Sequence, residues 1–260
     1  MKTAALFGGI YSNHLALREA LRDARRRGAE EIYCLGDLGG FGPHPDRVFP
    51  LLAECGVKAL QGNYDHSIGN GLDDCRCGYT DPRDNHYARL SYEYTLRNTS
   101  QANRCALASL PQAVRLTFAG RRVLLCHGSP RRTNEFLWES TTSDGFLERL
   151  LREHEADAVF ATHTGLKWQR RLQGGRLFAN VGVLGRPEND GAARVWYAIL
   201  HAGPGEIEVE FVPVEYDHEA LAREMREEKL PEEFVETVLT GWWTTCLEVL
   251  PAKERARGRF

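Results

Sequence analysis

Four side chains of metal-binding types each follow a short apolar run of the sequence. They are one carboxylate, one amide and two imidazoles: Asp37, Asn63, His127 and His163. Ligand sites in open α/β sheets lie where strands end, so side chains in such positions can converge. A mixed set of oxygen and nitrogen ligands suits Zn, Mn, Fe or Ni and leaves a coordination position open. We therefore expect one transition-metal site; the competing interpretation is four unrelated polar residues at loop ends.

The first two of these residues must be positioned by alternating strands and helices. Short apolar runs predict strands at 3–7, 32–35 and 57–60. Asn13 is expected to cap a helix after the first strand, and another helix is expected near 46–55. This alternation predicts parallel strands joined by helical crossovers.

The second half of the chain predicts further strands and helices. Pro213 is expected to end the last strand, because proline donates no hydrogen bond to a neighbouring strand. The whole pattern predicts an α/β sandwich of two mixed sheets with helices outside. The predicted strands are 114–118, 121–126, 157–161, 193–200 and 206–212, with a hairpin across Gly174-Gly175, and the predicted helices are 86–98, 101–109, 143–154, 217–228 and 231–249.

Two segments stand apart from this pattern. Residues 66–86 are rich in Gly, Asp and Cys and are expected to form a long insertion loop, a candidate substrate-selecting lid. Cys75 and Cys77 in this loop are interpreted either as metal-binding or redox-active, or as inert thiols. We expect residues 1–215 to form the main domain and 216–260 a helical extension that packs on it. Trp242-Trp243 in the extension either pack on the core or form a partner contact.

Composition excludes several classes of protein. The 260 residues carry a formal charge of −3, which argues against a dedicated nucleic-acid surface. No apolar run approaches the roughly 18 residues of a membrane span. Seven cysteines, an odd number, do not suggest a disulfide framework, and we expect a reducing cytoplasmic location. Buried positions are expected for Cys34 and Cys126, which lie in apolar runs.

Three motifs carry a resemblance to a known family. They are Gly36-Asp37-Leu38-Gly39-Gly40-Phe41-Gly42-Pro43, then His127-Gly128-Ser129-Pro130 with Glu135-Phe136-Leu137 downstream, and Asn180-Val181-Gly182-Val183-Leu184-Gly185-Arg186-Pro187. In their order and spacing the sequence resembles the calcineurin-like metallophosphoesterase superfamily, especially small bacterial phosphodiesterases with a Ser-Asp-Ile-His-Gly-Asn loop. The resemblance extends from about Ala5 to near Pro213. It implies a four-layer α/β/β/α sandwich, here with C-terminal helices added.

The resemblance implies two metals that share a bridging carboxylate. The ligand set of the second metal is complete as Asp37, Asn63, His127 and His163. The set of the first metal is not, because its three remaining positions hold other residues: Gly9, Tyr11 and Gly165. We therefore expect one divalent or trivalent transition-metal ion (Mn, Fe, Zn or Ni) and no second ion.

Tyr11 stands where the family has a first-loop histidine, and its role has two interpretations. It either ligates a ferric ion as a phenolate, or fills the vacated volume and hydrogen-bonds substrate or water; we favour the second. Asn13, from the same loop, is a further candidate substrate contact.

Further candidates follow from the third and fourth loops. Tyr64 replaces a histidine that often protonates the leaving group in the family, and tyrosine is a poor acid near neutral pH. Asp65 or His66 could substitute for that histidine. Arg131 and Arg132 follow the Gly-Ser-Pro turn and are candidates to clamp a phosphate.

Two functions from different classes are therefore open. The first is a metal-dependent phosphoester hydrolase, a phosphatase or phosphodiesterase, acting on a small phosphorylated or nucleotide substrate. The alternative is a catalytically weak or inactive module that binds a nucleotide, another anion or a protein partner. The C-terminal extension is a candidate surface for homo-oligomers, and no membrane partner is expected.

Overall fold

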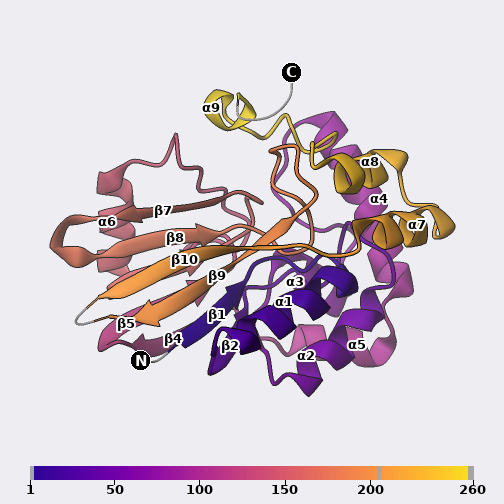
Figure 1. Ribbon diagram of the computed structural model, residues 1–260. Helices are drawn as coiled ribbons and strands as arrows, with labels where there is room; N and C mark the ends of the chain where they lie inside the picture. Colours follow the sequence, from indigo (N-terminus) through magenta and orange to yellow (C-terminus); the bar gives the residue numbers. More distant parts are fainter. Residues whose placement is uncertain (1–2, 204–205, 257–260) are drawn as a thin grey trace.

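Two mixed sheets pack face to face, with helices on their outer faces (Figure 1). The structure is a computed structural model that describes residues 3–203 and 206–256. Each sheet has five strands. The expected four-layer α/β/β/α sandwich is confirmed.

The first sheet has the strand order β10-β9-β1-β2-β3. Strands β1, β2 and β3 run parallel, whereas β9 and β10 are antiparallel to their neighbours. The parallel strands aim their carboxyl ends at one edge, where two of the predicted ligands follow. The strands are β1 (Thr3–Phe7), β2 (Glu31–Cys34), β3 (Lys58–Ala59), β9 (Val195–Ala202) and β10 (Ile207–Val214).

The second sheet has the order β4-β5-β6-β8-β7. Strands β5, β6 and β8 are parallel, and β4 and β7 are antiparallel at the two sides. The expected hairpin across Gly174-Gly175 joins β7 to β8 through the 3-10 turn η2. The elements are β4 (Ala113–Phe118), β5 (Arg121–Cys126), β6 (Ala158–Ala161), β7 (Lys167–Arg171), η2 (Gln173–Gly175) and β8 (Leu177–Val181).

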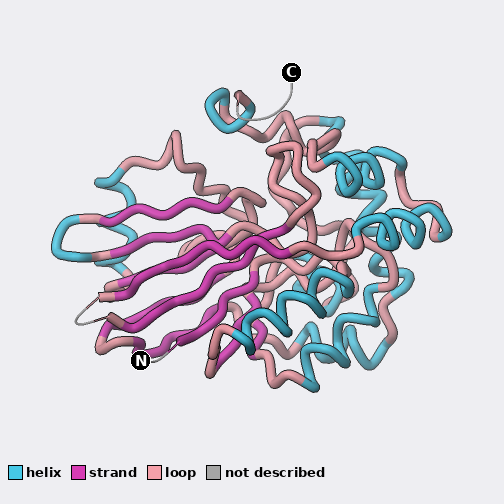
Figure 2. The backbone as a smooth tube through the Cα atoms, viewed as in Figure 1, coloured by secondary structure: helices cyan, strands magenta, loops and turns pink. Residues whose placement is uncertain are grey.

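In the view of Figure 2 most of the helices, in cyan, lie to the right of the strands, in magenta. The Asn13 side chain accepts a hydrogen bond from the Ala16 N–H, so the predicted cap of the first helix is confirmed. The helices are α1 (His14–Arg26), η1 (Pro45–Arg47), α2 (Val48–Glu54), α3 (Asn63–Gly69), α4 (Pro82–Asn98), α5 (Gln101–Ala108), α6 (Asp144–Glu153), α7 (His218–Glu227), α8 (Glu232–Thr240) and α9 (Ala252–Arg255).

Alternation along β1 divides its side chains between two buried layers. Leu6 lies in the layer between the sheets with Leu125 and Phe160 of the second sheet. Phe7 points to the opposite face and belongs to the layer beneath the helices, with Leu17 of α1. Burial on both faces fixes the register, since a slip of one residue would exchange the two faces.

Three predicted element boundaries are wrong. The irregular insertion is shorter than 66–86, because α3 runs to Gly69 and Pro82 begins α4. Strand β10 continues through Pro213 to Val214, which an edge strand tolerates. The predicted helix 231–249 ends at Thr240, because Gly241 adopts a left-handed φ of 72°.

The C-terminal extension packs on the main domain, and Trp243 is buried in that contact. Its indole Nε1–H donates to the Pro187 carbonyl over 2.7 Å, and its backbone N–H donates to Asn189 Oδ1 over 2.8 Å. Trp242 packs against Gly191. Trp243 therefore packs on the core, whereas Trp242 is partly exposed and its role in a partner contact stays a prediction. No helix among the described residues is long and apolar enough to cross a membrane.

Cys75 and Cys77 form a disulfide bond, so neither offers a thiolate to a metal. The interpretations as metal ligands and as inert thiols are therefore wrong, redox use stays a prediction, and the pair forms a covalent clip on the loop after α3. Cys34 and Cys126 are free and buried, as expected.

Candidate metal centre

Three of the four predicted ligands meet in one buried cluster. Ligand atoms of Asp37, His127 and His163 all lie within 4.8 Å of one another, and all three residues are buried. They come from both sheets, because Asp37 follows β2, His127 follows β5 and His163 follows β6. The cluster therefore sits where the strand ends of the two sheets converge.

Asp37 and His163 are held in unfavourable backbone conformations. Their φ angles are 57° and 73°, in the left-handed region that residues with a side chain rarely adopt. Such conformations persist only where the surroundings enforce them, and they concentrate at functional sites. The enforcement at Asp37 comes from Asp65, whose carboxylate accepts hydrogen bonds from the Asp37 and Leu38 N–H groups over 2.7 and 3.0 Å.

Asp65 is a positioning residue and not a lining residue of the site. Its carboxylate also accepts the Gly62 N–H over 2.8 Å, so it is committed to three backbone donors. Burial and then the Asp37 charge raise the pKa of Asp65 to about 6, while the backbone donors oppose that rise. The candidate leaving-group acid is thus tied to the loop that carries Asp37.

His127 presents its Nε2 atom to the cluster. Its Nδ1 lies 2.6 Å from the Leu35 carbonyl, which can only accept, so Nδ1 carries the proton. Nε2 lies 3.2 Å from Asp37 Oδ2 and 3.2 Å from His163 Nδ1. This is the arrangement in which a metal-binding histidine has its second nitrogen fixed by a backbone carbonyl.

The protonation of the cluster follows from burial and from the Asp37 charge. Burial opposes the charge on Asp37, but His127, His163 and the Tyr64 N–H together outweigh it, so the pKa of Asp37 is lowered. Burial likewise opposes protonation of His127, but Asp37 reverses the effect and the pKa of His127 is raised. Burial and then the charge of His127 lower the pKa of His163 to about 3, so this imidazole is neutral and free to coordinate.

Asn63, the fourth predicted ligand, lines the same cavity as Asp37 and His163. Its Nδ2 donates to the Cys75 carbonyl over 2.9 Å and to Cys77 Sγ over 3.4 Å, which leaves Oδ1 as the free acceptor. Oδ1 is buried without a hydrogen-bond partner among the described residues.

His163 Nε2 is also buried without a hydrogen bond of good geometry within the described ranges, although the Cys77 backbone acts on this imidazole. Unpartnered buried polar atoms beside a carboxylate–imidazole pair are costly unless a ligand satisfies them. A transition-metal ion fits this donor set of two imidazoles, one carboxylate and one amide.

The position of the first metal that the resemblance implies, called the first half-site below, is occupied by side chains of this protein. A Cβ atom added to Gly9 would lie 2.6 Å from Cε1 of Tyr11, so the Tyr11 ring occupies the space of the absent carboxylate. A Cβ added to Gly165 would lie 2.8 Å from Cη2 of Trp243 and 3.1 Å from Nη2 of Arg186. These contacts match the interpretation that Tyr11 fills the vacated volume.

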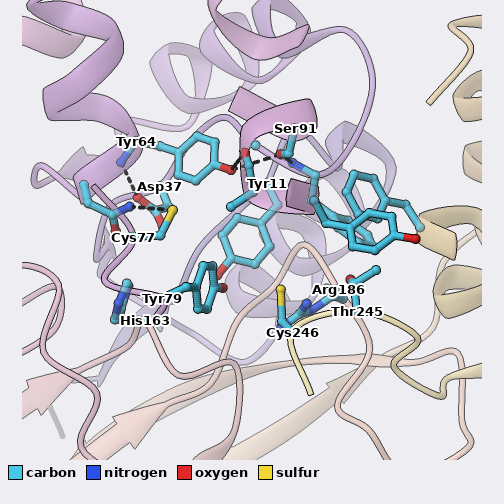
Figure 3. A pocket seen from close by; sticks show the side chains of 16 residues that line it. Tyr11, Asp37, Tyr64, Cys77, Tyr79, Ser91, His163, Arg186, Thr245 and Cys246 are labelled. Atoms are coloured by element: carbon cyan, nitrogen blue, oxygen red, sulfur yellow. Dashed lines mark hydrogen bonds between the residues drawn. The ribbon is translucent and has the colours of Figure 1, made fainter. Parts of the chain in front are cut away.

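A cavity of about 50 Å³ adjoins the cluster (Figure 3). Asp37, Asn63 and His163 line one part of it, and aromatic side chains line much of the rest. Tyr11, predicted from the sequence, lies between the cluster and Arg186 in Figure 3. The lining aromatic residues are Tyr11, Phe41, Tyr64, Tyr79, Tyr87 and Phe234.

The structure places the other third-loop and first-loop candidates in supporting positions. Tyr64 donates its N–H to Asp37 Oδ1 over 3.0 Å, and its hydroxyl lies 3.1 Å from Ser91 Oγ. His66 does not line the cavity; its Nδ1 lies 3.2 Å from Gln61 Oε1. Asn13 also lies outside the cavity lining.

The Asn13 side chain ties the first loop to the motif that contains Arg186. Its Nδ2 donates to the Gly185 carbonyl over 3.2 Å, while its oxygen caps α1. Arg131 and Arg132 do not line the cavity, and Arg131 pairs with Glu135 instead. Sequence reasoning missed Arg186, although it stands within the motif at 180–187, because its neighbour Trp243 is remote in the chain.

Residues 7–203 match the family model of the calcineurin-like phosphoesterase superfamily domain. The chain is 25% identical over 253 residues to uncharacterized protein MJ0912 of Methanocaldococcus jannaschii, covering 91% of this chain and 97% of that one.

Two solved structures extend the comparison. The crystal structure of a hypothetical protein from Pyrococcus horikoshii has a TM-score of 0.79 at 22% identity and covers 94% of this chain and 100% of that one. The crystal structure of a metallophosphoesterase from Sphaerobacter thermophilus has a TM-score of 0.69 at 25% identity, covering 92% and 99%.

Proposed function

Because this chain belongs to the calcineurin-like phosphoesterase superfamily, we propose that it is a phosphoester hydrolase that works with one transition-metal ion. The ion would be held by Asp37, Asn63, His127 and His163. The observation that carries this proposal is the buried Asn63 Oδ1, which has no hydrogen-bond partner within the described residues and lines the same cavity as Asp37 and His163.

The charge of this donor set favours a single ion. Asp37 is its one carboxylate, so a divalent ion would leave a local charge of about +1, which attracts a phosphoryl group. The filled space at Gly9 and Gly165 disfavours a second ion. Zn, Mn, Fe and Ni all suit mixed nitrogen and oxygen ligands.

When bound, the ion supplies Lewis acidity toward the phosphoryl oxygens of the substrate. The protein contributes orientation. Hydrogen bonds from the Tyr64 N–H to Asp37 and from His127 to the Leu35 carbonyl hold both side chains in place. Tyr64 keeps its hydroxyl on Ser91 and the Ala88 carbonyl, so it closes the cavity wall and does not protonate the leaving group.

The substrate would be a small phosphorylated molecule. The cavity of about 50 Å³ has room for a phosphoryl group, and its largely aromatic walls suit a flat organic part of the ester, such as an aryl group or a nucleobase, at its opening. Aromatic rings prefer stacked or edge-to-face partners, which a nucleotide would supply.

The test is hydrolysis of p-nitrophenyl phosphate and bis(p-nitrophenyl) phosphate by protein loaded with each metal. The Asp37→Ala variant should lose bound metal and turnover together. Asp73→Ala is the matched control, because Asp73 is exposed and lies outside the cavity lining. Full activity of Asp37→Ala would contradict the mechanism.

A second candidate is a binding module without catalysis, and the filled first half-site favours it. Metal bound at one equivalent with no turnover of either ester would support this module. Metal with turnover would support the hydrolase.

A further inference from the structure

Arg186 occupies the region beside the filled half-site and carries an uncompensated charge. The residue is 7% exposed, and its guanidinium lines the cavity together with Asp37 and His163. No carboxylate of residues 3–203 or 206–256 forms an ion pair with it, and Arg186 Nε is buried without a hydrogen-bond partner in those ranges. An unpaired charge this deeply buried is costly, so an anionic partner is missing.

Aromatic rings hold this guanidinium without neutralising it. Its Cζ lies 3.7 Å from the centroid of the Trp243 ring and 5.6 Å from that of Phe41. Cation–π contacts at the faces of the guanidinium leave the N–H donors at its edge available. The stacking therefore fixes the plane of Arg186 while its hydrogen-bonding capacity stays unused.

The backbone fixes Arg186 next to the first loop. The Leu184 and Gly185 N–H groups both donate to the Gly9 carbonyl, over 2.9 and 2.8 Å. A Cβ on Gly185 would lie 2.2 Å from the Ile10 carbonyl oxygen and 2.5 Å from Tyr11 Cβ, so only glycine permits this approach. The Arg186 side chain is delivered to the place that Gly9, Tyr11 and Gly165 leave without metal ligands.

Two hydroxyls near Arg186 add to the anion-binding character. Tyr11 and Tyr79 line the cavity, and the Arg186 charge acts on both hydroxyls. Burial outweighs that charge and raises the pKa of both phenols, so each remains a protonated O–H donor at neutral pH. Guanidinium and phenol donors together suit the oxygens of a phosphoryl group.

We propose that Arg186, stacked on Trp243, replaces the absent first metal as the cation that binds the phosphoryl group of the substrate. The site would take the dianion or monoanion of a phosphoester between Arg186 and the ion held by Asp37. This inference rests on the proposed function. The phosphoryl group would then be bound by one metal ion and one guanidinium, where the family has two metal ions.

The test is binding of inorganic phosphate to Zn-loaded protein, measured by isothermal titration calorimetry. Arg186→Met keeps an unbranched apolar side chain against Trp243 and should weaken phosphate binding about 10- to 100-fold, the loss expected for hydrogen bonds to a charged group. Zinc content should stay unchanged. Arg132→Met is the matched control, because Arg132 is exposed and outside the cavity lining.

The outcomes separate this inference from the proposed function. Unchanged phosphate affinity in Arg186→Met would overturn the role of Arg186 while leaving the metal site intact. Absence of zinc in the wild-type protein would overturn the proposed function instead. If the variant does not fold, the wild-type protein still decides: phosphate should shift the side-chain Nε–H resonance of Arg186 in a nitrogen–proton correlation spectrum, and no shift would overturn the inference.

Discussion

Three positions beside the cluster, Gly9, Tyr11 and Gly165, lack the metal ligands that the family resemblance implies. Gly9 stands where the family has an aspartate, and the ring of Tyr11 fills the space of that side chain. Gly165 stands where the family has a histidine, and Trp243 and Arg186 fill the space of that side chain. The convergence of Asp37, His127 and His163 could be predicted from the sequence, because each follows an apolar run. The position of Arg186 could not, because it depends on contacts with Trp243 of the C-terminal extension.

Restoring the lost carboxylate should destabilise the protein. In Gly9→Asp the new Cβ would lie 2.6 Å from the Tyr11 ring, and such overpacking costs about 1–3 kcal/mol of unfolding free energy. Urea unfolding measures the loss. Gly145→Asp is the control, since a Cβ there meets nothing within 4 Å. Equal stability of Gly9→Asp and the wild type would show that the space at Gly9 is open.

Asp65→Asn should lower stability and weaken the metal site. The carboxylate accepts three backbone N–H groups, and an amide places its own donors against one of them. We expect a loss of about 1–3 kcal/mol at pH 7.5, measured by urea unfolding. Asp217→Asn is the control, because Asn caps a helix as well as Asp. A loss no greater than in the control would contradict the positioning role of Asp65.

The secondary-structure elements bring the ligands together by ending at one place. Strand β2 of the first sheet and the parallel strands β5 and β6 of the second each end just before a residue of the cluster. The positions of these strands could be predicted from short apolar runs, whereas their order within the sheets could not. The insertion after α3 was predicted too long, because its ends have few apolar residues although they are helical. Its disulfide could not be predicted, since Cys-X-Cys spacing alone does not distinguish a bond from two thiols.

The disulfide loop should support metal binding through Asn63. The double variant Cys75→Ala/Cys77→Ala removes the clip and the Sγ contact of the Asn63 amide. Loss of a partner that orients a ligand lowers metal affinity about 10- to 100-fold, and we expect a weakening near the lower bound. Competition with a chromophoric zinc chelator measures it. Cys105→Ala, at an exposed free cysteine, should match the wild type. Equal affinity of all three proteins would refute the link.

The molecule as a whole has several buried clusters, and the C-terminal helices belong to the one that lies beneath the helices of the first sheet. The C-terminal helices α7 and α8 contribute to the same cluster as β1 and α1. Thr245 and Cys246 of this extension line the cavity, and Trp243 stacks on Arg186. The packing of the extension could be predicted from its apolar spacing, but its contact with the site could not, because no local pattern encodes where a chain end docks.

Removing residues 217–260 should abolish cooperative folding. Five side chains of α7 and α8 are at most 2% exposed: Leu221, Met225, Phe234, Val235 and Val238. Each contributes about 1.5–3 kcal/mol by burial, against a total stability of about 5–15 kcal/mol for a typical protein. Differential scanning calorimetry should show no cooperative transition for the truncated chain. A sharp transition would indicate that residues 1–216 fold alone.

The number of ions per chain tests the central claim most directly. Protein purified after saturation with Zn or Mn, freed of excess ion by gel filtration, is measured by inductively coupled plasma mass spectrometry. The proposed site predicts one equivalent in the wild type and none in Asp37→Ala. Two equivalents in the wild type would contradict the filled half-site, and none would contradict the metal centre itself.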